Sequence, residues 1–277
     1  MKTRIISGVI GALIAVIVLF FLPAEALNVA AAALAVVAVF EMLNTTGLMK
    51  HKGVLAVCAV YAAAIPLLGL LKVSVLLPAT VLFAAVLCAL QVVCHEQLQV
   101  EKTGFSFFAT LFITFSFLSL ANLRQMQHGL LYVLLTVVIP WMSDTGAYFT
   151  GTFCGKHKLC PKISPKKTVE GLIGGVVISV GCTVLTAWLY QRFAMPADTE
   201  ILWVRVALTA LCLAPISVLG DLFASIIKRQ TGIKDYGNLM PGHGGVMDRF
   251  DSVLPTASLL YLVVSYFPLI AQVISCQ

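Results

Sequence analysis

Gly129–Phe149 reads GLLYVLLTVVIPWMSDTGAYF, and this stretch decides what kind of protein the chain makes. It is predominantly apolar and has the length of about 20 residues that a helix needs to cross a bilayer. A segment in lipid must satisfy its own backbone hydrogen bonds, which favours a helix here. Asp144 stands inside the run, and an acidic residue within a membrane helix is costly and usually functional. The alternative is a helix that ends at Pro140 and leaves Asp144 in water.

Similar runs recur from one end of the chain to the other. Of the 277 residues, 60% are hydrophobic and 11% are charged, whereas about 25% are charged in a soluble domain. The runs are too long and too continuously apolar for the alternating strands of a membrane barrel. The sequence therefore predicts an all-α polytopic membrane protein with about nine transmembrane helices. The runs are Ile5–Leu22, Leu27–Leu43, Val54–Leu71, Val73–Val93, Phe105–Leu123, Gly129–Phe149, Gly171–Leu189, Ile201–Leu222 and Leu254–Ser275.

The basic residues predict which way the helices run. Fourteen of the 18 Lys and Arg residues fall on the side of the N-terminus, so the positive-inside rule predicts a cytoplasmic N-terminus. Lys2, Arg4 and the small residues Ala24-Glu25-Ala26 also resemble a cleavable signal peptide, although we favour a retained first helix. We expect residues 1–128 to form an N-terminal group of about five helices. Residues 129–277 would form a catalytic region with two cytoplasmic loops.

The first of these loops contains Ser164-Pro165-Lys166-Lys167-Thr168. Lys166 and Lys167 would lie at the start of the next helix, where backbone N–H groups and the helix dipole favour anions. With the hydroxyls of Ser164 and Thr168 beside them, the two lysines predict a phosphate-binding site. The alternative is that they are ordinary basic residues flanking a membrane span.

The second loop includes residues 225–252, SIIKRQTGIKDYGNLMPGHGGVMDRFDS, which crowd charges of both signs beside a glycine turn. Successive glycine N–H groups can form a concavity that binds anions, and Mg²⁺ prefers one or two carboxylates with waters and phosphates. The pattern thus predicts a site for a metal and phosphates, although mutual pairing of the charges is an alternative. Glu41, near the end of the second span, could be a further polar contact or an interfacial residue. The candidate metal ligands are Asp144, Asp221, Asp248 and Asp251.

The order of these residues resembles a family signature. Ser225-x-x-Lys228-Arg229-x4-Lys234-Asp235-x-Gly237, then Pro241-x-His243-Gly244-Gly245-x-x-Asp248-Arg249-x-Asp251, is similar to that of the bacterial phosphatidate cytidylyltransferases, or CDP-diacylglycerol synthases. Upstream, Ser143-Asp144-Thr145-Gly146-Ala147-Tyr148, Ser164-Pro165-Lys166-Lys167-Thr168 and Leu219-Gly220-Asp221 resemble the same family. The resemblance is strong over the C-terminal half, and the first five helices match only in character.

The resemblance implies an enzyme that joins CTP and phosphatidic acid into CDP-diacylglycerol and releases pyrophosphate. It implies dependence on Mg²⁺, with or without a second cation, and a homodimer in a lipid bilayer that binds no nucleic acid. The site would face the cytoplasm from the inner (plasma) membrane. The expected catalytic residues are Asp221, Asp248, Asp251, Lys228, Arg229 and Arg249. The expected substrate-binding residues are Ser164, Lys166, Lys167, Thr168, Lys234, His243, Gly244 and Gly245.

Two other functions use the same kinds of residue. A transporter for an anionic solute would use acidic residues within its helices as an ion relay, but it should carry polar groups on both sides of the membrane midplane. Here they gather on one side. A CTP-dependent lipid kinase would transfer the γ-phosphoryl group instead of the nucleotidyl group, and its products would distinguish it.

Overall fold

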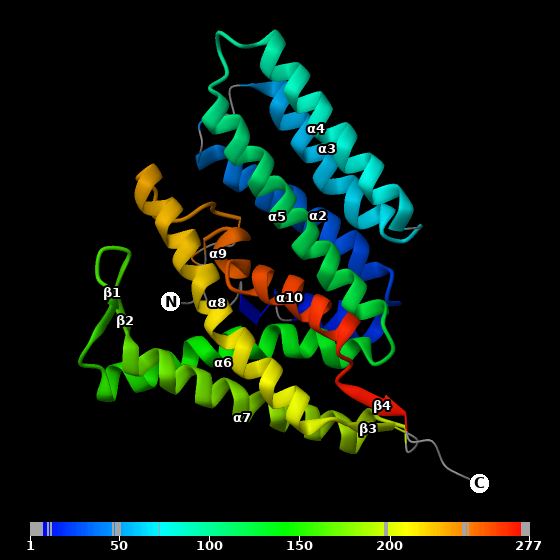
Figure 1. Ribbon diagram of the computed structural model, residues 1–277, viewed down its shortest axis with the longest axis vertical. Helices are drawn as coiled ribbons and strands as arrows, with labels where there is room; N and C mark the ends of the chain where they lie inside the picture. The colour runs from blue at the N-terminus through cyan, green and yellow to red at the C-terminus, as the bar shows by residue number, and fades with distance from the viewer. Residues whose placement is uncertain are drawn as a thin grey trace. The chain divides into compact units, whose positions relative to one another are not determined.

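The computed structural model describes residues 8–9, 11, 13–45, 47, 51–71, 73–196, 199–239, 242 and 244–272 (Figure 1). These residues are mostly helical, which confirms the predicted all-α class. The chain forms two units. The first comprises residues 1–125 and 228–250, and the second comprises residues 126–227 and 251–277.

The first unit is a set of apolar helices. Buried alanines at Ala31, Ala35 and Ala38 lie on one face of α2 and let its neighbours pack closely. Ile113 and Phe117 of α5 are fully buried in the same unit. The elements are η1 (Ile17–Phe21), α2 (Ala26–Thr45), α3 (Lys52–Leu68), η3 (Val73–Val75), α4 (Leu76–Val93), α5 (Val100–Gln125) and α9 (Met247–Phe250).

A buried polar network joins three helices of this unit. The Nδ2 of Asn28 in α2 donates to the carbonyl of Pro66 in α3 at 2.7 Å. The Oδ1 of Asn28 accepts from Nε2 of Gln125 in α5 at 2.6 Å. Asn28 is fully buried, so these two bonds satisfy amide atoms that have no access to water.

Replacing Asn28 with leucine should therefore destabilise the first unit. The change leaves the carbonyl of buried Pro66 without this partner, which costs about 1–3 kcal/mol for a buried polar group, whereas the amide of exposed Gln125 can bond to water. Equilibrium unfolding in detergent measures the loss. Asn44→Leu is the matched control, because Asn44 is exposed on the same helix. Equal stability of the two variants would contradict a structural role for the network.

The second unit contains the longest helices. Glycines let α6 and α7 approach closely, because a Cβ on Gly146 would lie 2.9 Å from the Cβ of Ile178 and one on Gly175 would lie 2.5 Å from the carbonyl oxygen of Ser143. Strands β1 and β2 pair antiparallel, as do β3 and β4. The elements are α6 (Gly129–Cys154), β1 (Lys158–Cys160), β2 (Ser164–Thr168), α7 (Val169–Ala194), β3 (Thr199–Ile201), α8 (Trp203–Thr231, whose end from Lys228 belongs to the first unit), α10 (Val253–Tyr266) and β4 (Ile270–Gln272).

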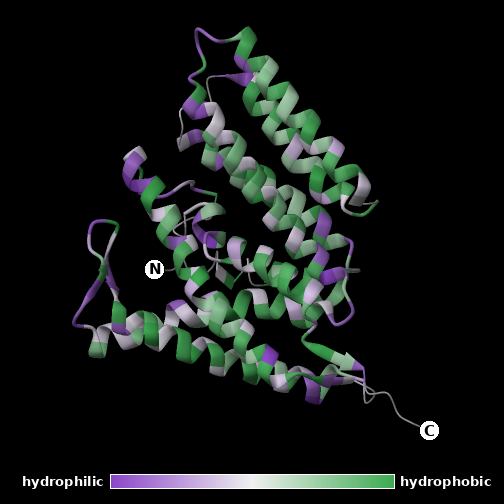
Figure 2. Cartoon of the chain, viewed as in Figure 1, coloured by the Kyte–Doolittle hydropathy of each residue, from purple (hydrophilic) through white to green (hydrophobic). Residues whose placement is uncertain are grey.

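Within the described ranges, six helices are long and apolar enough to cross a membrane: α2, α4, α5, α6, α7 and α8. Each coincides with a predicted run. The apolar helices α3 and α10 are shorter, and the run Ile5–Leu22 lies partly outside the described residues. Helix α10 ends at Tyr266 because Pro268 disfavours a helical conformation at Phe267. Hydrophobic residues cover the long helices, and hydrophilic ones gather in the β1–β2 hairpin (Figure 2).

Two helices extend further than their apolar runs. Helix α6 continues through Pro140 to Cys154, so the alternative in which it ends at Pro140 does not hold. Helix α8 continues beyond Asp221 to Thr231. Asp144 and Asp221 therefore both lie inside helices, which fixes the direction of each carboxylate better than a loop would.

Candidate functional site

An acid–lysine cluster, defined as Asp144, Lys167 and Asp221, lies within the second unit. Helix α6 carries Asp144, strand β2 carries Lys167 and helix α8 carries Asp221. The Nζ of Lys167 lies 2.5 Å from Oδ2 of Asp221. Asp144 interacts electrostatically with both partners. The structure thus brings together three residues that are far apart in the sequence and that the sequence analysis assigned to one site.

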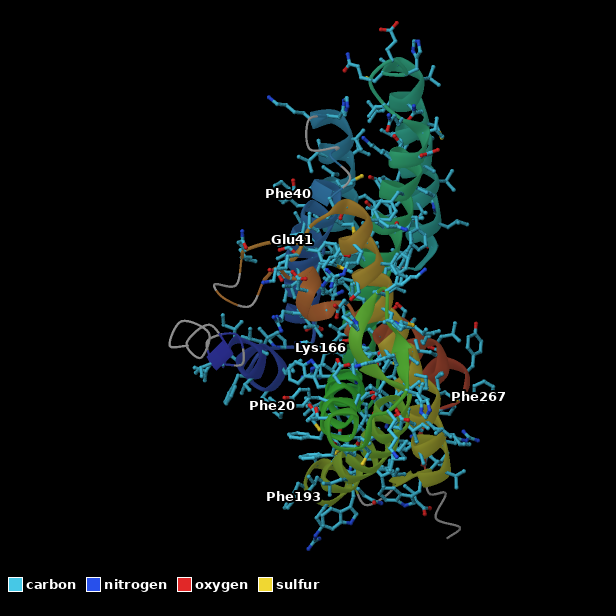
Figure 3. All side chains as sticks on the ribbon, turned by 90° about the vertical axis from the view of Figure 1, so that its left-hand side faces the viewer. Phe20, Phe40, Glu41, Lys166, Phe193 and Phe267 are labelled. Carbon is cyan, nitrogen blue, oxygen red and sulfur yellow. The ribbon has the colours of Figure 1, made fainter. Side chains whose placement is uncertain are left out.

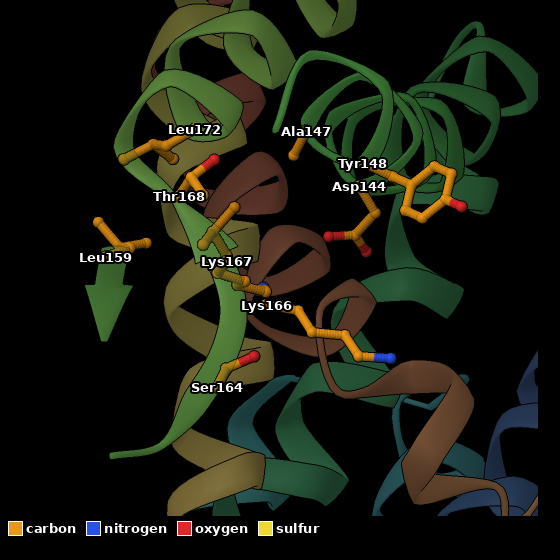
Figure 4. Close-up of a pocket in the computed structure, with 10 residues that line it drawn as sticks. Asp144, Ala147, Tyr148, Leu159, Ser164, Lys166, Lys167, Thr168 and Leu172 are labelled. Carbon is orange, nitrogen blue, oxygen red and sulfur yellow. The ribbon is translucent and has the colours of Figure 1, made fainter. Parts of the chain in front are cut away.

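Asp144 and Lys167 of this cluster line a pocket of about 220 Å³ (Figure 4). Asp144 reaches into it from α6, and Lys167 reaches in from β2 on the facing side. Five of the ten lining residues are charged or carry a small hydroxyl, namely Asp144, Ser164, Lys166, Lys167 and Thr168, although most of the pocket surface is apolar. The other half is Ala147, Tyr148, Leu159, Leu172 and Val218. Such a lining suits a ligand that has both an anionic group and an apolar part.

The ammonium of Lys167 has unused hydrogen-bonding capacity. Its Nζ is buried and close to Asp221, but the two are not aligned for a hydrogen bond, and no other described residue accepts from it. An ammonium group carries three N–H donors, and unused donors are costly once they are shielded from water. A phosphate oxygen in the pocket would satisfy them, so the geometry favours an anionic ligand at this position.

Local hydrogen bonds hold β2 in place beside the pocket. Thr168 caps α7, because its hydroxyl accepts from the N–H of Gly171 at 3.1 Å. The carboxylate of Glu170 accepts from the backbone N–H groups of Lys156 and His157. The Nδ1 of His157 also lies 2.6 Å from Oε1 of Glu170. These bonds fasten the β1–β2 hairpin to the first turn of α7, so Lys166 and Lys167 directly precede the N-cap of a helix.

A second group of charged residues lies within the first unit, centred on Asp248. Its Oδ1 lies 3.0 Å from Nζ of Lys228. Its Oδ2 accepts from the backbone N–H groups of Tyr236 and Gly245, at 2.8 and 3.0 Å. The Lys228 ammonium also stands over the ring of Tyr236, 5.3 Å from the ring centroid, in a cation–π contact. Asp248 therefore holds the backbone at Tyr236 and at Gly245, which is the last residue of the glycine turn, defined by the described residues Gly242, Gly244 and Gly245.

Glu41 is part of this group, although the sequence pattern did not assign it to the site. Its side chain lies in α2 (Figure 3), is 5% exposed and accepts from the backbone N–H groups of Val246 and Met247, at 3.0 and 2.8 Å. The signal in the sequence was an acidic residue inside a predicted span. Nothing in the sequence, however, pointed to a contact with residues so distant along the chain.

The other predicted residues are placed as follows. Arg229, Lys234 and Arg249 are exposed in the first unit, and His243 lies outside the described residues. Asp251 follows α9 and is buried in the second unit. Its carbonyl oxygen lies next to α8, because a Cβ on Gly220 would be 2.5 Å from it. Gly244 has a φ of +84°, a left-handed conformation that glycine adopts without strain.

The donor set of the acid–lysine cluster fits a magnesium ion. Among the residues that the structure describes, no three His, Cys, Asp or Glu side chains gather to hold a metal. Mg²⁺, however, usually takes one or two carboxylates from the protein and completes its shell with waters and phosphate oxygens. Asp144 and Asp221, which interact electrostatically with each other and with Lys167, supply such a pair.

Comparisons with known proteins identify the family of this chain. The model of a family described as the cytidylyltransferase family matches residues 2–267. A phosphatidate cytidylyltransferase of Bacillus subtilis is 32% identical over 277 residues, covering 96% of this chain and 98% of the relative. A phosphatidate cytidylyltransferase of Staphylococcus haemolyticus is 32% identical, covering 95% and 99%. A third, from Staphylococcus epidermidis, is 43% identical over about half of each chain. The chain therefore belongs to the cytidylyltransferase family.

Proposed function

We propose that the protein joins CTP and phosphatidic acid into CDP-diacylglycerol with release of pyrophosphate. The family and the names of the full-length relatives support this reaction. The observation that carries it in the structure is the buried ammonium of Lys167, which pairs with Asp221 and still has N–H donors to offer a phosphate, in a pocket lined by both polar and apolar side chains. Phosphatidic acid has the matching chemistry, with a phosphate at one end and acyl chains at the other.

The chemistry needs charge neutralisation more than proton transfer. A phosphate oxygen of phosphatidic acid forms a bond to the α-phosphorus of CTP, and the bond from that phosphorus to the β-phosphate oxygen breaks. The attacking oxygen is already ionised, because the second pKa of a phosphate monoester is about 6. Catalysis is then mostly positioning and stabilisation of charge. Lys166 and Lys167 would neutralise phosphate oxygens, and the hydroxyls of Ser164 and Thr168 would orient them.

The charged residues of the first unit would bind phosphate groups, as the sequence predicts. Lys228, Arg229 and Lys234 would neutralise phosphate charge, and Arg249 could hold a phosphate through two parallel hydrogen bonds. His243, Gly244 and Gly245 would contact phosphate oxygens. In the structure the N–H of Gly245 donates to Asp248, so Gly245 would have to exchange this bond for one to a phosphate oxygen when substrate binds.

Mg²⁺ is part of the proposal. Asp144 and Asp221 would hold it, and the sequence pattern also makes Asp248 and Asp251 candidate ligands. When bound, the ion would polarise phosphate oxygens and stabilise the leaving pyrophosphate. Lys167 and Asp221 form an ion pair in the structure, so Lys167 would move from this carboxylate to a phosphate once substrate and ion are present.

The membrane arrangement is also proposed. The apolar runs predict nine spans and the basic residues predict a cytoplasmic N-terminus, and the six long apolar helices support a protein that crosses the membrane several times. The site would then face the cytoplasm from the plasma membrane, where soluble CTP meets a lipid substrate. An N-terminal region of residues 1–128, a catalytic region of residues 129–277 and a homodimer complete the proposal.

Isotope labels on CTP test the reaction. With purified protein, phosphatidic acid in mixed micelles and Mg²⁺, we expect label on the α-phosphorus to enter the lipid and label on the γ-phosphorus to leave as pyrophosphate. Chelation of Mg²⁺ should abolish both the labelling of the lipid and the release of pyrophosphate, and added Mg²⁺ should restore the two. Transfer of the γ-label to the lipid would identify a lipid kinase instead. Lack of conversion under all conditions would refute the proposed reaction.

A further inference from the structure

Glu41, in helix α2, binds the backbone that directly follows the glycine turn of the same unit. Its two carboxylate oxygens accept from two successive backbone N–H groups, those of Val246 and Met247, across a separation of 205 and 206 residues. A carboxylate buried without donors would be very costly. The burial of Glu41 therefore depends on the position of these two N–H groups, and their position in turn depends on Glu41.

The backbone around the carboxylate is shaped to receive it. A Cβ on Gly237 or on Gly245 would collide with the Glu41 carboxylate. Only glycine at these two positions lets the chain pass so close. The close approach therefore depends on three residues. Glu41 lies on α2, and Gly237 and Gly245 lie in the segment that carries the family signature.

Asp248 holds the same segment through other atoms. It accepts from the N–H groups of Tyr236 and Gly245, whereas Glu41 accepts from those of Val246 and Met247. The ring of Phe250, at the end of α9, packs on Phe117 of α5 with 5.3 Å between ring centroids. Three successive amides, at residues 245, 246 and 247, are thus fixed by two carboxylates before the chain reaches Asp248.

We infer that Glu41 is a positioning residue that fixes the backbone of residues 245–247 and thereby orients Asp248 and the glycine turn. A carboxylate suits this task because it offers acceptors on both oxygens, whereas the amide of glutamine accepts through one oxygen and places N–H donors at the other position. Aspartate would keep both acceptors but is one methylene too short to reach. The expected loss of activity on replacing Glu41 rests on the proposed function, whereas the expected change in the backbone of residues 245–247 does not.

Hydrogen–deuterium exchange measures how well these backbone amides are protected. In Glu41→Gln we expect the amides of Val246 and Met247 to exchange at least tenfold faster than in the wild type, because each is held by a Glu41 oxygen. Peptides from α4 and α7 should be unchanged. The control is Glu25→Gln, since Glu25 is an exposed acid next to the same helix. Unchanged exchange at residues 246 and 247, or an equal change in the control, would overturn the inference.

Kinetics distinguish positioning from general stabilisation. At a temperature well below the unfolding midpoint of each variant, we expect Glu41→Gln to lower kcat for CDP-lipid formation at least tenfold, with Glu41→Asp also impaired. If Glu41 only stabilised the fold, kcat would recover on cooling and exchange would rise throughout α2, α3 and α5, and either result would overturn the inference. A wild-type protein that makes no CDP-lipid would refute the proposed function alone, because the exchange result would still stand.

A second pair of variants tests the close fit independently of activity. Gly237→Ala alone should accelerate exchange at Val246 and Met247, because its methyl group displaces the carboxylate. Adding Gly237→Ala to Glu41→Ala should cause little further acceleration, since the collision is then absent. Additive effects of the two substitutions would show that Gly237 and Glu41 act separately and would contradict the proposed fit.

Discussion

Replacing Lys167 with methionine will reduce CDP-diacylglycerol formation by about 100- to 1,000-fold, the usual effect of losing one preorganised charge-stabilising donor. Methionine keeps the length and apolar stem of the side chain but removes the ammonium. That ammonium is buried, pairs with the carboxylate of Asp221 and interacts electrostatically with that of Asp144, which leaves N–H donors unused. A phosphate in the pocket is the group that would use it. Initial rates in mixed micelles, with CTP and phosphatidic acid varied in turn, measure the loss.

The matched control is Lys162→Met, which removes one positive charge from the same hairpin. Lys162 is exposed in the turn between β1 and β2, so its loss should change the rate less than twofold. Thermal unfolding of both variants in detergent separates loss of chemistry from loss of fold. A folded Lys167→Met protein with wild-type rates would contradict the role of this ammonium in the reaction.

The sequence predicted much of the acid–lysine cluster because its signals are local. A long apolar run predicts a helix, and an acid such as Asp144 inside it stands out. Lys166 and Lys167 stand out because they precede the next run. What remained open was whether α6 ends at Pro140, since proline disfavours a helix interior. In the structure α6 runs on to Cys154, which places Asp144 beside Lys167.

Other features could not be predicted because they depend on distant contacts. Glu41 has no sequence neighbour that explains it, and its partners are backbone groups more than 200 residues away. The pairing of β3 with β4 joins residues 199–201 to residues 270–272, and neither stretch has the alternation that marks a strand. Backbone hydrogen bonds of this kind carry no signature in side-chain identity, so a single sequence does not reveal them.

The second large effect concerns Asp248. We expect Asp248→Asn to lower the rate of CDP-lipid formation by at least about 100-fold. In the structure one carboxylate serves Lys228, the N–H of Tyr236 and the N–H of Gly245. Asparagine has one acceptor oxygen and one NH₂ group. Its NH₂ group must therefore point either at the Lys228 ammonium or at the two backbone N–H groups, and in both cases donors oppose donors. Both arrangements leave Lys228 without its negative partner in a site where the carboxylate side chain is 6% exposed.

The dependence of the remaining activity on Mg²⁺ then distinguishes two roles for this carboxylate. If Asp248 is a ligand of the ion, the Mg²⁺ concentration for half-maximal rate should rise at least tenfold in Asp248→Asn. If it acts through the glycine turn alone, the rate at saturating Mg²⁺ should fall while that concentration stays constant.

Glu96→Gln is the control, because it removes one exposed negative charge from the same unit. Because Asp248 already accepts from two backbone N–H groups and pairs with Lys228, an unchanged Mg²⁺ requirement would leave Asp144 and Asp221 as the carboxylates that hold the ion. Wild-type rates in Asp248→Asn would contradict both roles.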